Sequence, residues 1–212
     1  MGKISDFKSK NKFDDSGGTI VAIASSTGGP KALHEVIPKL PKNINAPVVV
    51  VQHMQDGFTK QLADRMNELS ELKVIEAQDN MELKKGYVYI AKAGMHLQII
   101  KRKNREYIAL TDEPHREGVK PCANYMYESL CNSIYSKIIC VVLTGMGADG
   151  TEGILKLKEK KRISVIIQNK ETCVVYGMPG SISRQQIEYT ELPIEQISNE
   201  IIRQTGVNQN GC

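Results

Sequence analysis

Four short, strongly apolar runs most constrain the fold of this chain, and they lie at residues 19–24, 48–51, 137–143 and 163–168. They show almost no alternation of apolar and polar residues, which is typical of strands buried on both faces. Segments with helical spacing of apolar residues lie between them. Because strands that alternate with helices form right-handed crossovers, the pattern predicts an α/β fold: a mostly parallel, doubly wound sheet with helices on both faces.

The helices expected around these strands span residues 30–40, 58–69, 123–135, 150–160 and 193–204. The less regular middle of the chain is predicted to hold short strands at residues 87–90, 95–101 and 107–110, including a short antiparallel hairpin. The basic run 101–105 is expected to be an exposed part of that hairpin.

The length of 212 residues fits one compact domain with tails. Residues 1–18 end in Ser-Gly-Gly and are expected to form a flexible tail or a linker remnant. The predicted domain spans residues 19–205, and residues 206–212 are expected to form a C-terminal tail.

Composition excludes several classes of function. The net charge of +4 is spread along the chain and Trp is absent, so nucleic-acid binding is not expected. No apolar run approaches the roughly 20 residues of a membrane helix, and the N-terminus lacks the apolar core of a signal peptide. Five cysteines without a C-x-x-C pair indicate neither structural zinc nor a disulfide framework, so reduced thiols in a cytoplasmic protein are expected.

Reactive side chains follow three of the four buried strands. Ser25, Ser26 and Thr27 follow the first, His53 follows the second, and Asp149 lies in the glycine-rich turn after the third. Ligands bind beyond the carboxyl ends of the strands in an open parallel sheet, so these groups are expected on one edge. A histidine that takes the hydroxyl proton and a carboxylate that orients the imidazole make nucleophilic acyl transfer possible.

Simpler roles remain open for each of these residues. Ser26 or Thr27 could only satisfy N–H groups in the turn before the first helix, and His53 could be a buried histidine bonded to a carbonyl. Asp149 and Glu152 match the D-x-x-E spacing of a capping box. Asp149 is therefore expected to cap the following helix as well as orient His53. On that reading Asp149→Asn costs much activity but only about 1 kcal/mol or less of stability.

A dinucleotide-binding module is the alternative from a different class. Gly145, Gly147 and Gly150 fit G-x-G-x-x-G between a predicted strand and a helix, and Glu171 lies about 20 residues further on. Against this alternative, Asp149 would place a negative charge beside the pyrophosphate. The motif also comes late in the chain, with no second mononucleotide-binding half after it.

Segments 24–30, 51–59, 86–91, 143–150 and 168–179 together resemble the catalytic domain of the chemotaxis protein-glutamate methylesterases. The resemblance covers about residues 19–203. It implies that Ser26, rather than Ser25, is the nucleophile, that His53 is the general base and that Asp149 is its partner. The backbone N–H groups of Thr27 and Met146 are the candidate oxyanion donors.

The resemblance also implies a reaction and a partner. The family hydrolyses glutamate γ-methyl esters in the helical cytoplasmic region of methyl-accepting chemotaxis receptors and deamidates certain glutamines there. It works through an acyl-serine intermediate, with no metal or cofactor, in the cytoplasm. An esterase or amidase acting on another carbonyl substrate is the alternative within the same chemistry.

Two departures from the family pattern stand out. Lys-Pro-Cys-Ala-Asn at residues 120–124 replaces the common Arg-Pro-Ser-x-Asp, which puts substrate positioning or local packing in doubt. The family also carries an N-terminal phosphoacceptor receiver domain, whereas only about eighteen residues precede the first predicted strand. A stand-alone enzyme or an isolated catalytic domain is expected, with no switching by aspartyl phosphorylation in cis.

Overall fold

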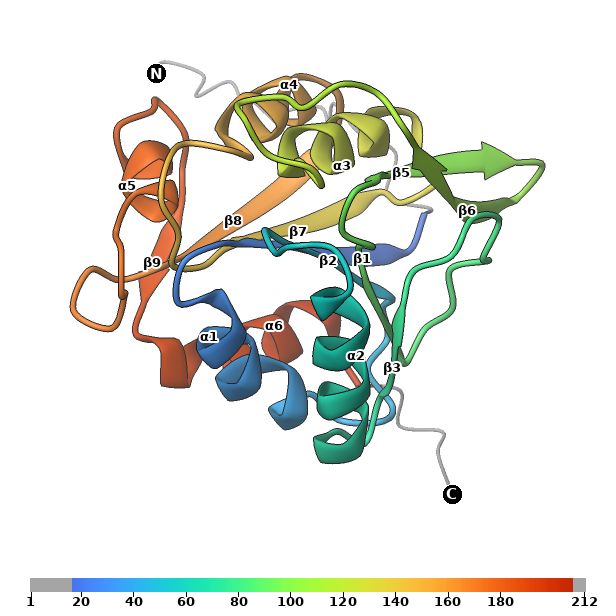
Figure 1. Ribbon diagram of the computed structural model, residues 1–212, viewed down its shortest axis with the longest axis horizontal. Coiled ribbons are helices and arrows are strands. Elements are labelled where there is room, and N and C mark those ends of the chain that lie inside the picture. The colour runs from blue at the N-terminus through green and yellow to red at the C-terminus, as the bar shows by residue number, and fades with distance from the viewer. Residues whose placement is uncertain (1–16, 208–212) are drawn as a thin grey trace, which may run out of the picture.

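The computed structural model describes residues 17–207, so most of both predicted tails (1–16 and 208–212) lies outside the described residues. Seven strands form one sheet in the order β3-β4-β2-β1-β7-β8-β9, and every neighbouring pair is parallel (Figure 1). The strands are β1 (Thr19–Ser25), β2 (Val48–Gln52), β3 (Lys73–Glu76), β4 (Tyr87–Ile90), β7 (Lys137–Val142), β8 (Arg162–Gln168) and β9 (Thr190–Leu192). The predicted mostly parallel sheet is confirmed.

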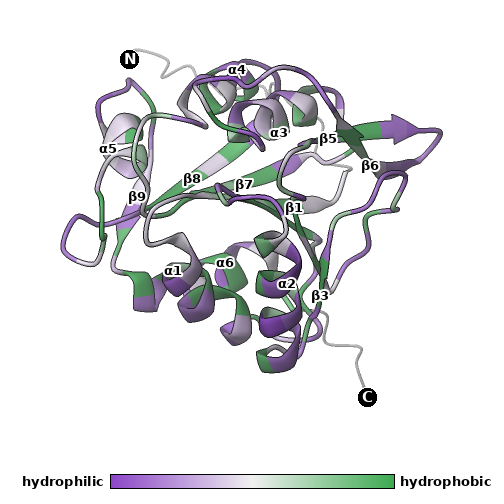
Figure 2. Cartoon of the chain, in the orientation of Figure 1, coloured by the Kyte–Doolittle hydropathy of each residue, from purple (hydrophilic) through white to green (hydrophobic). Residues whose placement is uncertain are grey.

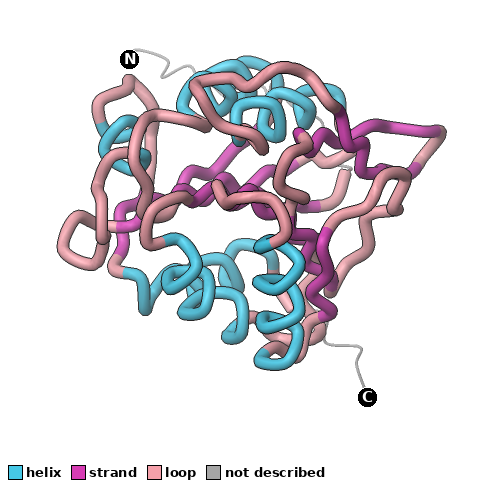
Figure 3. Tube along the Cα trace, in the orientation of Figure 1, coloured by secondary structure: helices cyan, strands magenta, loops and turns pink. Residues whose placement is uncertain are grey.

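Helices cover both faces of the sheet, as predicted (Figure 3). One layer contains α1 (Gly29–Val36), α2 (Phe58–Leu69) and α6 (Ile194–Thr205), and the other contains α3 (Ala123–Ser129), α4 (Thr151–Lys160) and α5 (Met178–Ser183). Alternate residues of each strand point to opposite faces, so Val21 and Ile23 of β1 join the core under α1, whereas Ala22 and Ala24 join the core under α3. Figure 2 shows these strands mostly in hydrophobic colours.

The predicted hairpin is formed by β5 (His96–Arg102) and β6 (Arg105–Thr111), which pair antiparallel. Its turn carries the basic run, and residues 101–105 are exposed as expected. The strand predicted at residues 87–90, by contrast, is not part of the irregular middle, because it lies in the main sheet between β3 and β2.

Three short elements were not predicted: β3, α5 and β9. Each has six residues or fewer, which is too short for a period of apolar residues to be visible. The first predicted helix also ends early, at Val36, and a 3₁₀ turn (Ile37–Lys39) continues it because Pro38 has no N–H for an α-helical bond. The third ends at Ser129 in a similar turn (Leu130–Asn132).

The described ends of the chain stay attached to the domain. The carbonyl of Gly18 accepts a hydrogen bond from the N–H of Ser136 (3.0 Å), and Val207 forms an antiparallel bridge with Ile44. Within residues 17–207, no helix has both the length and the apolar composition needed to cross a bilayer.

The closest helix approach that positions the site is between α3 and α4, at Gly153. A Cβ there would lie 2.8 Å from the carbonyl oxygen of Asn124 and 2.9 Å from its Cα. Alanine favours a helix by about 1 kcal/mol over glycine, but backbone atoms cannot move aside cheaply. We therefore expect Gly153→Ala to lower the free energy of unfolding by about 1–3 kcal/mol, measured by urea denaturation.

Glu159→Ala is the control for this substitution, because Glu159 is exposed on the same helix. Its effect should stay within about 0.5 kcal/mol. A Gly153→Ala protein as stable as the natural chain would show that α3 and α4 do not depend on this close approach.

Candidate active site

The carboxyl ends of three adjacent strands bring the predicted site residues to one edge of the sheet. β1 lies between β2 and β7, and Ser25 pairs with Gln52 where β1 and β2 end. Ser26 follows β1 directly, His53 follows β2 directly, and Asp149 ends the loop between β7 and α4. The chain order of the strands reverses between β1 and β7, so this edge is the switch point at which doubly wound folds bind their ligands.

His53 and Asp149 form a buried pair. The imidazole Nε2 of His53 lies 2.7 Å from Oδ2 of Asp149, and their side chains are 10% and 3% exposed. Burial alone raises the pKa of the Asp149 carboxyl, but hydrogen bonds from His53, Cys122 and the N–H of Ala123 outweigh it and hold that pKa below its usual value. Asp149 is therefore ionised at neutral pH, and the other imidazole nitrogen, Nδ1, is left to act as a base.

The expected capping role of Asp149 is wrong, because its carboxylate faces the start of α3 rather than α4. It accepts hydrogen bonds from the N–H groups of Ala123 (2.6 Å) and Asn124 (2.9 Å) and from the thiol of Cys122 (3.0 Å). Gly150, with φ of 95°, follows Asp149 and directly precedes α4, which it does not cap because it has no side chain. This left-handed turn directs the carboxylate away from the helix that it precedes.

Asn124 supplies the cap that was expected of Asp149. Its Oδ1 accepts hydrogen bonds from the N–H groups of Gly150 (3.1 Å) and Gly153 (2.7 Å), at the start of α4. Glu152, the other member of the expected capping box, instead contacts Arg116 at 2.7 Å. The two helices thus cap each other, with Asp149 serving α3 and Asn124 serving α4.

The two serines at the end of β1 differ in whether the hydroxyl has a hydrogen-bond partner. The buried hydroxyl of Ser25 donates to Oε1 of Gln52 (2.7 Å), whereas the hydroxyl of half-buried Ser26 has no hydrogen-bond partner among the described residues. The Cβ of Ser26 would be only 2.8 Å from a Cβ placed on Gly145, so a glycine is needed beside it. Ser26 thus lies against the glycine-rich turn that leads to Asp149.

Two backbone N–H groups near Ser26, those of Thr27 and Met146, have no acceptor among residues 17–207. The carbonyl of Gly145 accepts from the N–H groups of Gly177 (3.0 Å) and Met178 (2.9 Å) at the start of α5. Because N–H and C=O point in opposite directions across a trans peptide, the N–H of Met146 points away from α5. The turn around Ser26 therefore has unused donors of the kind that stabilise an oxyanion.

Sequence reasoning missed several residues that hold this site together. Gln52 was placed only between the second predicted strand and His53, with no role of its own, although the structure buries this polar side chain and so requires hydrogen-bond partners for it. Cys122 and Asn124 were noted as departures from a family pattern, not as partners of Asp149. The contact of Gly145 with the start of α5 had no sequence signal, because the two lie about 30 residues apart in the chain.

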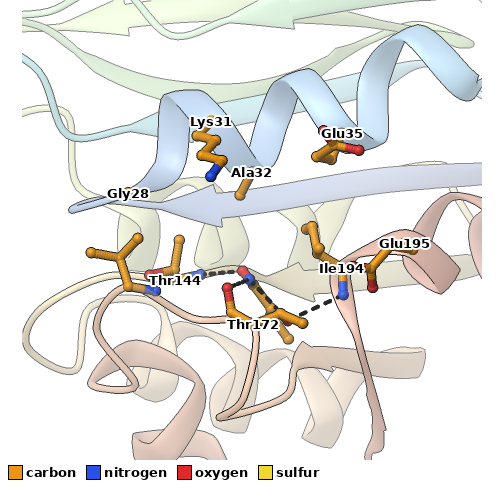
Figure 4. A pocket seen from close by; sticks show the side chains of 10 residues that line it. Gly28, Lys31, Ala32, Glu35, Thr144, Thr172, Ile194 and Glu195 are labelled. Carbon is orange, nitrogen blue, oxygen red and sulfur yellow. Dashed lines mark hydrogen bonds between the residues drawn. The ribbon is translucent and has the colours of Figure 1, made fainter.

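A cavity of about 380 Å³ lies between α1 and the start of α6, and Gly28 of the turn after β1 lines it (Figure 4). Thr144 forms part of its wall and Lys31 points toward it, with Glu35 and Glu195 nearby. Neither His53 nor Asp149 lines it, so the cavity adjoins the site without being part of it.

The dinucleotide alternative finds little support at the glycine turn. The N–H groups of Gly150 and Gly153, which a pyrophosphate would need, already donate to Asn124, and the N–H of Gly145 donates to Val175 (3.0 Å). Among the described residues, no three His, Cys, Asp or Glu side chains are grouped to hold a metal ion. Among the described residues, His34 and His115 have no hydrogen bond to Ser26, His53 or Asp149. His96 is buried and bonded to the carbonyl of Pro114, and its Nδ1 accepts the N–H of Cys122 at 3.2 Å, beside Asp149.

The protein is an α/β domain with a polar site beyond the ends of its strands. Its doubly wound parallel sheet carries a serine, a histidine and an aspartate at the carboxyl edge. The chain belongs to the CheB methylesterase family, whose model matches residues 21–201. The crystal structure of the Thermotoga maritima CheB methylesterase catalytic domain is similar, with a TM-score of 0.84 and 44% identity. The match covers 88% of this chain and 98% of that one.

Curated relatives carry the name protein-glutamate methylesterase/protein-glutamine glutaminase. The protein from Thermotoga maritima is 44% identical over 185 residues, which cover 87% of this chain and 54% of the relative. The protein from Bacillus subtilis is 42% identical over 185 residues, which cover 87% of this chain and 52% of the relative. The chain thus spans about half the length of the curated relatives that it matches.

The bonds to α3 change what is expected of Asp149→Asn. Whichever way the amide is turned, its NH₂ replaces an oxygen that accepts N–H groups, so buried donors lose their partner. We expect the free energy of unfolding to fall by about 2 kcal/mol or more, measured by urea denaturation. Glu152→Gln, at the other position of the expected capping box, should change it by less than about 1 kcal/mol. Equal stability of Asp149→Asn and the natural chain would contradict this.

The same carboxylate should make stability depend on pH. The pKa of Asp149 in the folded protein lies below its usual value of 3.8. Its stabilising contribution is therefore complete above that value and is lost as the pH falls through the folded-state pKa. The stability difference between the natural chain and Asp149→Asn should shrink in acid below pH 3.8. A difference that is constant with pH would show that ionised Asp149 is not its source.

Proposed function

We propose that this chain hydrolyses γ-methyl esters of glutamate side chains in a protein, with Ser26 as the nucleophile. The observation that carries the proposal is the 2.7 Å contact between His53 and Asp149, beside a serine hydroxyl that has no other partner among the described residues. Membership of the CheB methylesterase family supports the choice of ester. The names of the curated relatives add deamidation of protein glutamines as a second reaction of the same site.

In the first half of the reaction, Nδ1 of His53 takes the hydroxyl proton of Ser26 while Oγ attacks the ester carbonyl carbon. Ionised Asp149 stabilises the imidazolium that forms. The N–H groups of Thr27 and Met146 bind the oxyanion of the tetrahedral intermediate. The intermediate then expels methoxide, which takes the proton from His53 and leaves as methanol, and the acyl group stays on Ser26.

In the second half, His53 takes a proton from water and the resulting hydroxide attacks the acyl carbon. The tetrahedral intermediate collapses to a free glutamate carboxyl group, and the imidazolium returns its proton to Oγ of Ser26. With a glutamine substrate the same steps release ammonia instead of methanol. No step requires a cofactor.

The substrate that we propose is the helical cytoplasmic region of methyl-accepting chemotaxis receptors, so the site would work in the cytoplasm. An esterase or amidase acting on another carbonyl substrate would use the same three residues. Release of methanol from methylated receptor membranes distinguishes the two proposals, because the second predicts hydrolysis of small esters but none of receptor esters.

Ser26→Ala should lower methanol release by several orders of magnitude, as loss of a nucleophile does in other serine hydrolases. Ser25→Ala is the matched control, because its hydroxyl is buried and already bonded to Gln52. It should lower the rate only mildly. The reverse outcome would assign the nucleophile to the wrong serine, and a fully active Ser26→Ala protein would remove the serine mechanism altogether.

A thermal-shift titration tests the dinucleotide alternative directly. NAD should leave the melting temperature unchanged, whereas a serine-reactive ester analogue should raise it in the natural chain but not in Ser26→Ala. A saturable shift with NAD alone would favour the alternative.

A further inference from the structure

Gln52 joins the Ser26 turn to the segment that carries His53. Its side chain, 1% exposed, donates both amide hydrogens, one to the carbonyl of Ser26 and one to the carbonyl of His53, each at 2.9 Å. Its Oε1 accepts the hydroxyl of Ser25 at 2.7 Å. A single buried amide thus holds the backbone carbonyl of the candidate nucleophile and that of the candidate base.

The bond to the carbonyl of Ser26 also sets the direction of a neighbouring donor. Ser26 and Thr27 share a peptide plane, in which the N–H of Thr27 points opposite to the carbonyl of Ser26. The N–H of Gly29 also donates to that carbonyl, at 2.8 Å. While Gln52 and Gly29 together hold the carbonyl inward, the N–H of Thr27 must point outward. That N–H has no acceptor among the described residues.

Thr144 holds the next carbonyl of the same turn. Its hydroxyl, in a side chain that is almost fully buried, donates to the carbonyl of Thr27 at 3.0 Å and accepts the N–H groups of Val174 and Val175, both at 3.0 Å. Thr144 lies at the end of the cavity shown in Figure 4. The Thr27 residue is therefore held by Gln52 on its N-terminal side and by Thr144 on its C-terminal side.

The amide of Gln52 packs closely against Gly29 at the start of α1. A Cβ placed on Gly29 would lie 1.9 Å from Oε1 of Gln52 and 2.9 Å from the Cβ of Ser25. The amide therefore fits against the bare backbone at the start of α1, and its three hydrogen bonds set which way its oxygen faces.

We propose that Gln52 and Thr144 are positioning residues that direct the N–H of Thr27 toward the oxyanion of the acyl-transfer intermediates. The inference rests on the proposed function, because only a reaction through a tetrahedral oxyanion needs that donor. Neither side chain touches substrate. Their effect falls on the transition state, in which the charge develops, and not on substrate binding.

Three variants test this with methylated receptor membranes as substrate. Gln52→Met keeps the size of the side chain and removes its three hydrogen bonds. Thr144→Val removes the hydroxyl, and Thr144→Ser restores it. Because loss of a whole oxyanion donor costs about 10²–10³ in kcat, misdirecting one should cost about 10- to 100-fold. We expect that loss in Gln52→Met and Thr144→Val with KM changed by less than threefold, and recovery of most of it in Thr144→Ser.

A second readout separates positioning from loss of structure. A trifluoromethyl ketone analogue of the glutamate side chain forms an oxyanion when the nucleophile adds to it, so its inhibition constant should rise in parallel with the fall in kcat. The pH dependence of kcat/KM in Thr144→Val should match that of the natural chain, because the Thr144 hydroxyl has no hydrogen bond to His53 or Asp149. Thr151→Val is the matched control: it also removes a buried hydroxyl bond (2.9 Å to Ser181) but contacts no part of the Ser26 turn.

The possible outcomes are distinct. The proposal is overturned if kcat stays within threefold of normal in Gln52→Met and Thr144→Val while Ser26→Ala is inactive. It is also overturned if Thr151→Val loses as much kcat as Thr144→Val, or if the pH dependence of kcat/KM changes in Thr144→Val, because either result assigns the loss to general structure or to His53. If Gln52→Met does not fold, the Thr144 pair decides. A fully active Ser26→Ala protein would instead overturn the proposed function.

Discussion

The carboxylate of Asp149 is the group on which the rest of the site depends. An ionised carboxylate that is only 3% exposed is costly unless donors surround it, and here the N–H groups of Ala123 and Asn124 and the thiol of Cys122 supply them. Those donors belong to the start of α3, so the position of the helix and the position of the charge fix each other. The imidazole of His53 then meets a negative charge that is already in place before any reaction begins.

Topology explains why three distant segments meet at this carboxylate. β1 is central, with β2 on one side and β7 on the other, and all three run parallel, so their following loops emerge together. The crossovers through α1 and α4 leave toward opposite faces, which opens a space between the loops at the strand ends. Glycine at position 145 lets the loop after β7 come against Ser26. The fold thus needs no long-range flexibility to bring the site residues to one place.

The sequence predicted well the features that depend on apolar patterns over many residues, and it predicted individual hydrogen bonds poorly. The buried strands, the two helical layers and the shared edge for Ser26, His53 and Asp149 all follow from apolar patterns over many residues. The capping box failed because D-x-x-E spacing describes a helix in isolation, whereas the donors of α3 compete for Asp149 through tertiary structure. Gln52 was overlooked for a related reason: its three partners are set by strand pairing and by turn geometry, which no local pattern contains.

In the unusual segment at residues 120–124, Cys122 and Asn124 make the hydrogen bonds that the site needs. Burial raises the pKa of the Cys122 thiol, so the thiol stays protonated and donates to Asp149 as the serine common in the family would. Asn124 caps α4 through its Oδ1, which an oxygen of an aspartate could also do. Nδ2 of Asn124, however, donates to Glu117 at 2.5 Å. An aspartate would repel that carboxylate, so the amide and Glu117 fit as a pair. Cys122 and Asn124 therefore hold Asp149 and cap α4 with the side chains that this chain has.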